Sequence, residues 1–203
     1  MALARNPMVA ASLVVVAAVL VMALFAPWLA PKDPYLQNLP DRRAAPSAEY
    51  PLGADEFGRD ILSRVIYGAG IALRVATVAT GLGLVLGSAL GLAAGFLGGF
   101  VDDLLMRATD VLLAFPYLLL AIAIVTALGP GEASTQIAIG FWALPAFARL
   151  VRGSALALRE KEFVEAARAQ GAGAARILAR YILPNCLSPV IVLATLFVAR
   201  AIM

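Results

Sequence analysis

Side chains that carry out chemistry in enzymes are few in this sequence. It has no histidine, one cysteine (Cys186, inside an apolar run) and two lysines, Lys32 and Lys161. Hydrolytic triads need an activating base such as histidine, and zinc sites need several cysteine or histidine ligands. Neither lysine ends a G-x-x-x-x-G-K phosphate-binding loop. We therefore expect no catalytic residue, no metal site and no cofactor in this chain, and any nucleotide chemistry would belong to another subunit.

The most informative polar segment spans residues 149–180. Glu162 and Glu165 open a predicted short helix, Gly171 and Gly173 can end it with a left-handed residue, and Pro184 opens the next apolar run. Such a helix–turn–helix could dock in the groove of a partner, with Ala166 and Ala167 allowing close approach, but a plain basic loop at a membrane surface also explains the charges. Around it stand seven basic and three acidic side chains: Arg149, Arg152, Arg159, Lys161, Arg168, Arg176 and Arg180, with Glu160, Glu162 and Glu165.

Four glycines, Gly83, Gly87, Gly91 and Gly95, recur at every fourth position of an uncharged stretch. Glycines at this spacing share one face of a helix and let a second helix approach closely. The plain interpretation is structural packing. A contact at which the two helices slide past each other as the protein works is the alternative, and the spacing does not separate the two.

The elements that hold these residues are predicted to be membrane helices. The chain is 62% hydrophobic and 14% charged, with a mean hydropathy of +0.90, well above the apolar share of soluble domains. A bilayer core about 30 Å thick needs about 20 apolar residues in a helix. We expect five spans, with Pro116 kinking the third and the acids around Asp102 marking its solvated start: residues 8–29, 75–101, 111–131, 132–149 and 181–199.

The charges also predict the orientation of the chain. Basic residues concentrate on the cytoplasmic side of membrane proteins, which places the 149–180 loop inside, and counting spans backwards places the N-terminus with Arg5 inside as well. Residues 31–74 have balanced charge and fit the outside, with an amphipathic helix over 60–74 at the membrane surface. The net charge of +3 does not form a nucleic-acid footprint.

The spacing of the 149–180 loop resembles the signature of bacterial ABC importer permeases. Glu165-Ala166-Ala167 is followed by three residues, Gly171, nine residues and then Tyr181-Ile182-Leu183-Pro184, with Tyr181 the one departure from the usual isoleucine. Three further stretches, residues 50–69, 95–99 and 147–153, resemble the C-type subunit of the dipeptide/oligopeptide/nickel permeases. Because members of that family run on through a sixth span, we expect that the final part of the protein is missing from this chain.

This resemblance implies an all-α, polytopic transmembrane bundle with the type I (MetI-like) importer fold. It implies a second related permease subunit, two cytoplasmic ATPases that bind the ATP, an extracytoplasmic substrate-binding protein and a bacterial inner membrane. The docking residues map to Glu165, Ala166, Ala167 and Gly171. The expected domains are an N-terminal anchor (1–30), a periplasmic segment (31–69) and the permease domain (70–203) with its coupling loop at 150–183.

Dipeptides or oligopeptides are the expected cargo, with nickel or glutathione as alternatives within the family. No residue is assigned to substrate. A secondary transporter is the alternative from another class, but it usually needs an ionisable group near mid-membrane, and none of the apolar spans has an acid, histidine or lysine at its middle. A membrane scaffold without a transport role would not need a docking loop of this spacing.

Overall fold

The computed structural model describes residues 7–203 and forms two compact units, residues 1–74 and 75–203. The described residues form helices and no strand, as the predicted all-α class requires. Arg5, on which the inside placement of the N-terminus depends, lies outside the described residues.

In the first unit, α1 (Pro7–Leu29) is uncharged along its whole length and almost entirely apolar. A long segment with one 3-10 turn, η2 (Leu39–Asp41), leads from it to α2 (Ile61–Leu97). The sequence predicts a short surface helix over 60–74 and a separate span from 75, and this division is wrong. Residues 71–80 contain neither proline nor glycine, and one arginine, Arg74, does not end a helix, so all 37 residues form one helix.

Helix α2 is longer than a bilayer core is thick. Thirty-seven residues at 1.5 Å each make a helix of about 55 Å, against a hydrocarbon core of about 30 Å. A helix of this length extends well beyond a bilayer core, which agrees with the amphipathic character of its first turns.

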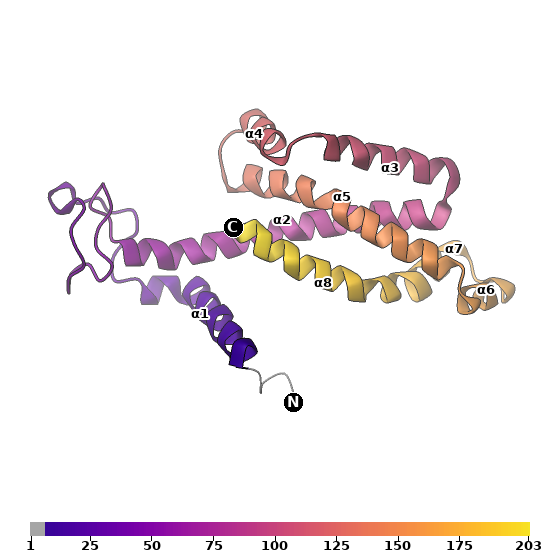
Figure 1. Cartoon of the computed structure of the whole chain (residues 1–203), viewed down its shortest axis with the longest axis horizontal. Helices are drawn as coiled ribbons and strands as arrows, with labels where there is room; N and C mark the ends of the chain where they lie inside the picture. Colours follow the sequence, from indigo (N-terminus) through magenta and orange to yellow (C-terminus); the bar gives the residue numbers. More distant parts are fainter. Residues whose placement is uncertain (1–6) are drawn as a thin grey trace. The chain divides into compact units, whose positions relative to one another are not determined.

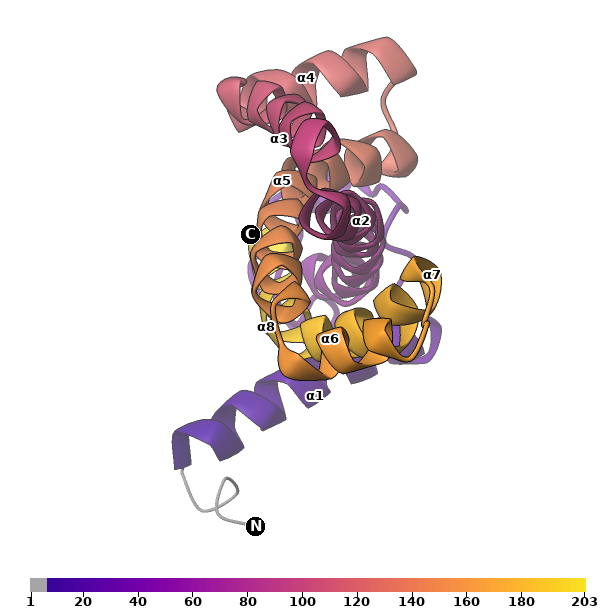
Figure 2. The same cartoon turned by 90° about the vertical axis from the view of Figure 1, so that its right-hand side faces the viewer.

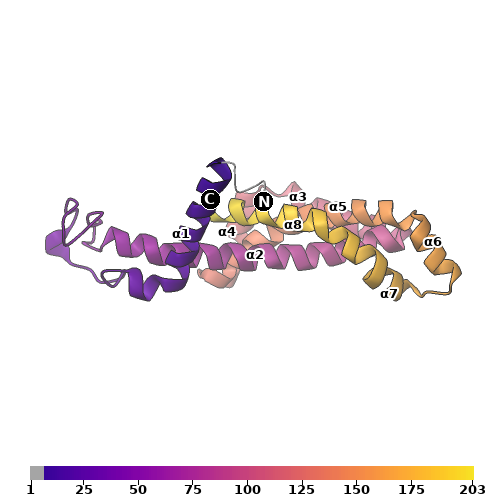
Figure 3. The same cartoon turned by 90° about the horizontal axis from the view of Figure 1, so that it is seen from below.

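After α2 the second unit has six more α-helices and one π-helical turn (Figure 1). Their bounds are α3 (Gly99–Ala114), α4 (Tyr117–Leu128), α5 (Glu132–Arg159), α6 (Glu162–Ala169), α7 (Ala174–Ile177), and α8 (Leu183–Ile202), with a π-helical turn, η3 (Leu178–Ile182), between the last two. Helix α5 packs against α3, α4 and α8, and Figure 2 shows it between α3 and α8 in end view. Helices α6 and α7 lie beyond the ends of α5 and α8 (Figure 3).

The third predicted span is broken where Pro116 interrupts it. Helix α3 ends at Ala114 and α4 begins at Tyr117, and the two axes are bent by 93°. Proline has no amide hydrogen to donate and forces the residue before it away from helical angles, and Phe115 accordingly has an extended backbone. The predicted kink is confirmed, and it is sharp enough to make either a broken span or a re-entrant loop.

Three helices of the described chain are long and apolar enough to cross a membrane: Pro7–Leu29, Ile61–Leu97 and the combined Ala174–Ile202. The bent α3–α4 pair makes a possible fourth. Helix α5, predicted as a span over 132–149, runs ten residues further to Arg159. It is not among the helices that are both long and apolar enough to cross a membrane. Much of its surface is covered by protein instead, with Phe147, Ala148 and Val151 almost wholly buried.

Aromatic rings join α4, α5 and α8. Trp142 of α5 lies 5.1 Å from Tyr117 and 5.3 Å from Phe197, measured between ring centroids. Phe147 also meets Phe197 at 5.3 Å. Tilted pairs at this distance contribute beyond the area that they bury, so this half of the unit has a compact core around Phe197.

Candidate functional site

Helix α6 is a short projection with a well-formed end. Glu162 and Glu165 lie in its first turn, where carboxylates favour the positive end of the helix dipole. At its other end Gly171 has a φ of +79°. The amide of Ala172 donates to the Ala167 carbonyl at 3.0 Å, and the amide of Gly171 donates to the Arg168 carbonyl at 2.9 Å. These two bonds form a Schellman motif, so Gly171 is needed for its left-handed conformation.

The predicted docking residues of α6 divide between two faces. Glu165 and Ala166 are exposed to solvent. Ala167 is 4% exposed and points with Val164 into the core of the chain itself. Of the two alanines that were expected to face a partner, only Ala166 is exposed, because Ala167 already packs inside the chain.

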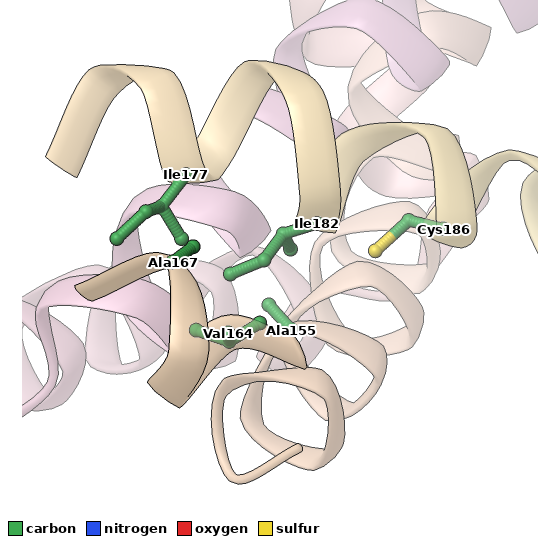
Figure 4. Close-up of a cluster of buried hydrophobic side chains, with 6 residues drawn as sticks. All are labelled: Ala155, Val164, Ala167, Ile177, Ile182 and Cys186. Atoms are coloured by element: carbon green, nitrogen blue, oxygen red, sulfur yellow. The ribbon is translucent and has the colours of Figure 1, made fainter. Parts of the chain in front are cut away.

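A cluster of buried apolar side chains anchors this projection (Figure 4). Val164 and Ala167 of α6 meet side chains from four other elements in it, while Leu92 and Phe96 of α2 pack against its edge. The four are Ala155 of α5, Ile177 of α7, Ile182 of η3 and Cys186 of α8. This cluster therefore fixes α6 to the ends of α2, α5 and α8 through close packing.

Tyr181, the one departure from the family signature, has a specific contact here. Its ring stacks on Phe163 of α6 with centroids 6.4 Å apart and planes at 28°. Phe163 remains 41% exposed beside Ala166. An aromatic residue at position 181 thus covers one side of Phe163 and leaves the other side free.

The four spaced glycines of α2 lie against the backbone of α5. A Cβ atom added to Gly83 would come within 2.6 Å of Ala143 Cβ, and one added to Gly95 within 2.7 Å of the Arg152 carbonyl oxygen. Added atoms at Gly87 and Gly91 would meet the carbonyl oxygens of Leu144 and Ala148. The contacts advance together along both helices, so α2 and α5 run parallel, at a distance that only glycine permits.

Two ion pairs join α3 to α5. Arg152 donates from Nε and one Nη to the two carboxylate oxygens of Asp102, at 2.5 and 2.6 Å. Arg149 pairs with Asp110 at 2.7 Å, with both side chains more than half exposed. The interpretation of the acids near residue 102 as a solvated helix start is therefore incomplete, because Asp102 accepts a bidentate pair from a helix 50 residues away in sequence.

The segment before α2 is organised around Asp55. Burial disfavours the charge of this carboxylate, but hydrogen bonds from the amides of Arg59 and Phe57 and from the Arg59 side chain together lower the pKa of Asp55. Gly58, with a φ of +72°, packs against the backbone of Asn38 so closely that no other residue fits without a shift. This turn lies within residues 50–69, where the sequence resembles peptide permeases.

Comparison with known proteins defines the class to which these features belong. Residues 77–203 match the family described as the binding-protein-dependent transport system inner membrane component, and residues 1–46 match the N-terminal TM domain of oligopeptide transport permease C. The chain belongs to this family of transport permeases, and it is a multi-pass membrane protein.

Individual relatives are similar over almost the whole chain. The dipeptide transport system permease protein DppC of Alkalihalophilus pseudofirmus is 44% identical over 99% of this chain, and the di/tripeptide permease DppC of Pseudomonas aeruginosa is 41% identical over 89%. The glutathione transport system permease protein GsiD of Escherichia coli is 43% identical over 98%. The chain spans 66%, 62% and 66% of the lengths of these three relatives.

Proposed function

We propose that this chain is a permease subunit of an ATP-binding-cassette importer and that it transmits movement from cytoplasmic ATPases to the translocation pathway. The observation that carries the proposal is the construction of α6. It presents Glu165, Ala166 and Phe163 outward, while its inner face is anchored to the ends of the membrane helices. A projection that is exposed on one side and anchored on the other can act as a lever.

The transmission follows from the packing. When an ATPase displaces α6, the buried cluster moves the end of α5, and the glycine contacts make α2 move with it. The Asp102–Arg152 pair adds α3 to the same group. A coupled conformational change requires that the partner bind one arrangement better than the other, and the exposed face of α6 is where such a difference would arise.

The partners follow from this proposal. They are two cytoplasmic ATPases that bind and hydrolyse ATP, a second related permease that completes the pathway, and an extracytoplasmic binding protein that delivers substrate. The N-terminus and α6 then face the cytoplasm of a bacterial inner membrane, with the segment between α1 and α2 outside. The domain divisions at residues 30 and 69, and a chain without catalytic activity, belong to the same proposal.

Dipeptides and short oligopeptides are the proposed cargo. Two of the relatives above are named for dipeptides or di- and tripeptides and one for glutathione, itself a peptide, at nearly equal identity. That equality favours a peptide backbone as the shared feature of the cargo, and glutathione is the second candidate.

The docking role is tested with matched alanine-to-arginine variants of the full-length protein, expressed with its ATPases. Ala166 on α6 and Ala175 on α7 are both exposed, so neither change should disturb the core. Ala166→Arg should abolish co-purification of the ATPases and substrate-stimulated ATP hydrolysis, because the new side chain holds the surfaces apart. Ala175→Arg should retain both. Normal ATPase recovery with Ala166→Arg would overturn the assignment.

A further inference from the structure

The basic residues of the 149–180 loop divide into two groups in the structure. Arg149 and Arg152 pair with acids of α3. Arg159 contacts Glu160 and the Gly95 carbonyl oxygen. The chain itself therefore holds three of the basic groups. The side chains of the other four have no ion pair or hydrogen bond within residues 7–203: Lys161, Arg168, Arg176 and Arg180.

Local charge separates these four residues further. Lys161 and Arg168 flank or end α6, whose first turn has two acids, so that segment is neutral overall. Residues 171–199 contain no acid, and their only charged side chains are Arg176 of α7 and Arg180 of η3. Both arginines are exposed. They form a pair of positive charges, four residues apart, that nothing nearby in the sequence compensates.

This pair stands at the beginning of a segment that can cross a membrane. Residues Ala174–Ile202 are together long and apolar enough to do so. One side of the segment is buried in the chain, through Ile177, Ile182 and Cys186 (Figure 4). The two exposed arginines lie off that side, and so do three apolar side chains that follow them, which we call the α8 stripe: Leu183, Leu187 and Ile191, with 39%, 47% and 59% exposure.

The α8 stripe has the dimensions of a lipid chain in one leaflet. Its members are four residues apart, which keeps them on one face of a helix. From Leu183 to Ile191 the helix rises about 12 Å at 1.5 Å per residue. Half of a bilayer core about 30 Å thick is about 15 Å. The stripe therefore covers most of the depth of one leaflet, with the two arginines at its outer end.

We propose that Arg176 and Arg180 bind the phosphate of an anionic phospholipid, and that an acyl chain of this lipid lies along the α8 stripe. Guanidinium groups bind phosphate through parallel N–H donors, and basic residues beside a membrane helix attract anionic headgroups. A zwitterionic lipid carries its own cation beside the phosphate. A free phosphate or an acidic protein surface in water would leave the apolar stripe uncovered. An anionic lipid matches both the charge and the stripe.

The lipid site is independent of the proposed docking of ATPases. It uses α7, η3 and α8, whereas docking uses the exposed face of α6, and lipid binding requires neither ATP nor cargo. Its consequence is mechanical, because Ile177 and Ile182 beside the arginines share a buried cluster with α6. A lipid held there would fix the base of the α6 projection to the membrane surface.

The test is native mass spectrometry of the full-length protein in its complex, stripped of lipid in detergent and titrated with palmitoyl-oleoyl phosphatidylglycerol. One such lipid per copy of the chain should bind at least about tenfold more tightly than phosphatidylcholine with the same acyl chains. Glycerol 3-phosphate, which has the phosphate without the chains, should not displace it. Equal binding of the two lipids, or displacement by glycerol 3-phosphate, would overturn the proposal.

Variants place the lipid at the two arginines. Arg176→Gln combined with Arg180→Gln should weaken phosphatidylglycerol binding at least about tenfold, because each basic group near the surface adds to the attraction. Both positions are exposed, so the Tm should not change. Arg42→Gln combined with Arg43→Gln removes the same charge from two exposed residues before α2 and should leave binding unchanged.

Recovery of the ATPases with each variant distinguishes a lipid from a protein partner. Both double variants should retain the ATPases, since α6 is unaltered in each. Loss of the ATPases from the Arg176 and Arg180 variant, with phosphatidylglycerol binding unchanged, would refute the lipid site and assign the two arginines to a protein surface.

Discussion

A methyl group added at Gly91 tests the close contact between α2 and α5. In Gly91→Ala the new Cβ would lie 3.0 Å from both Arg152 N and Val151 Cβ and closer still to the Ala148 carbonyl oxygen, whereas ordinary contacts begin at 3.4 Å. Because these neighbours are mainly backbone within a helix, they cannot rotate away, and the two helices must separate. Gly81 offers a matched control in the same helix, since an added Cβ there meets nothing within 4 Å.

The expected magnitudes have opposite signs. Overpacking of a tight contact typically costs about 1–3 kcal/mol, while replacing an unconstrained helical glycine by alanine gains up to about 1 kcal/mol. For a chain of this size, 1 kcal/mol shifts the Tm by roughly 2–4 °C. Gly91→Ala should therefore unfold about 2–12 °C below the unmodified protein, and Gly81→Ala at or slightly above it.

The assay is thermal unfolding of the purified full-length protein in nanodiscs, followed by tryptophan fluorescence, with Trp142 of α5, whose ring lies 5.3 Å from that of Phe197 in α8, as a reporter. Peptide-stimulated ATP hydrolysis of the assembled complex is measured in parallel and should fall only for Gly91→Ala. Equal melting temperatures for the two variants would refute the inference that the glycine spacing sets the distance between α2 and α5.

Three further predictions test the loop and its supports. Gly171→Ala should destabilise the end of α6 by about 1–2 kcal/mol, the cost of a left-handed backbone for a residue with a side chain. Gly173→Ala should have no such cost, because Gly173 has a φ of −67°. Hydrogen exchange should show faster amide exchange confined to α6 in the first variant only. Arg152→Gln should lower the free energy of unfolding by about 1–3 kcal/mol, because it leaves the Asp102 carboxylate, only 13% exposed, without its partner. Arg149→Gln should lower it by less than about 1 kcal/mol, because its pair with Asp110 is exposed. Equal Tm values for the two variants would contradict this difference. The lowered pKa of Asp55 means that its stabilising contribution is complete above its unfolded pKa of about 3.9 and is lost as pH falls through the lower folded value. Stability of the unmodified protein measured from pH 6 to pH 2 should fall more steeply than that of Asp55→Asn, and parallel curves would show that the carboxylate has no such role.

Features that depend on local pattern could be predicted from the sequence. The kink at Pro116 follows from one residue type, and the apolar run of α1 follows from composition alone. The left-handed end of α6 at Gly171 follows from the residue and its position after a short helix.

Features that depend on distant partners could not be predicted in this way. The Asp102–Arg152 pair joins residues 50 apart, and only the packing of α3 on α5 brings them together. The inward position of Ala167 depends on the phase of a helix only eight residues long, which small side chains do not reveal. The division of the basic residues of 149–180 into paired and unpaired groups likewise depends on the packing of α3 on α5, since the sequence shows a single basic segment.

The π-helical turn η3, between α7 and α8, gives the fixed spacing of the loop a geometric meaning. Ile177 and Ile182 are five residues apart and would point in well-separated directions on an α-helix of 3.6 residues per turn. The wider turn at 178–182, with its i→i+5 pattern, brings both into the same buried cluster. The nine residues between Gly171 and Tyr181 therefore set the rotation of α8 about its own axis relative to α6. Removing one of them would rotate α8 by about 100° relative to α6 and turn Cys186 away from the cluster that it now completes.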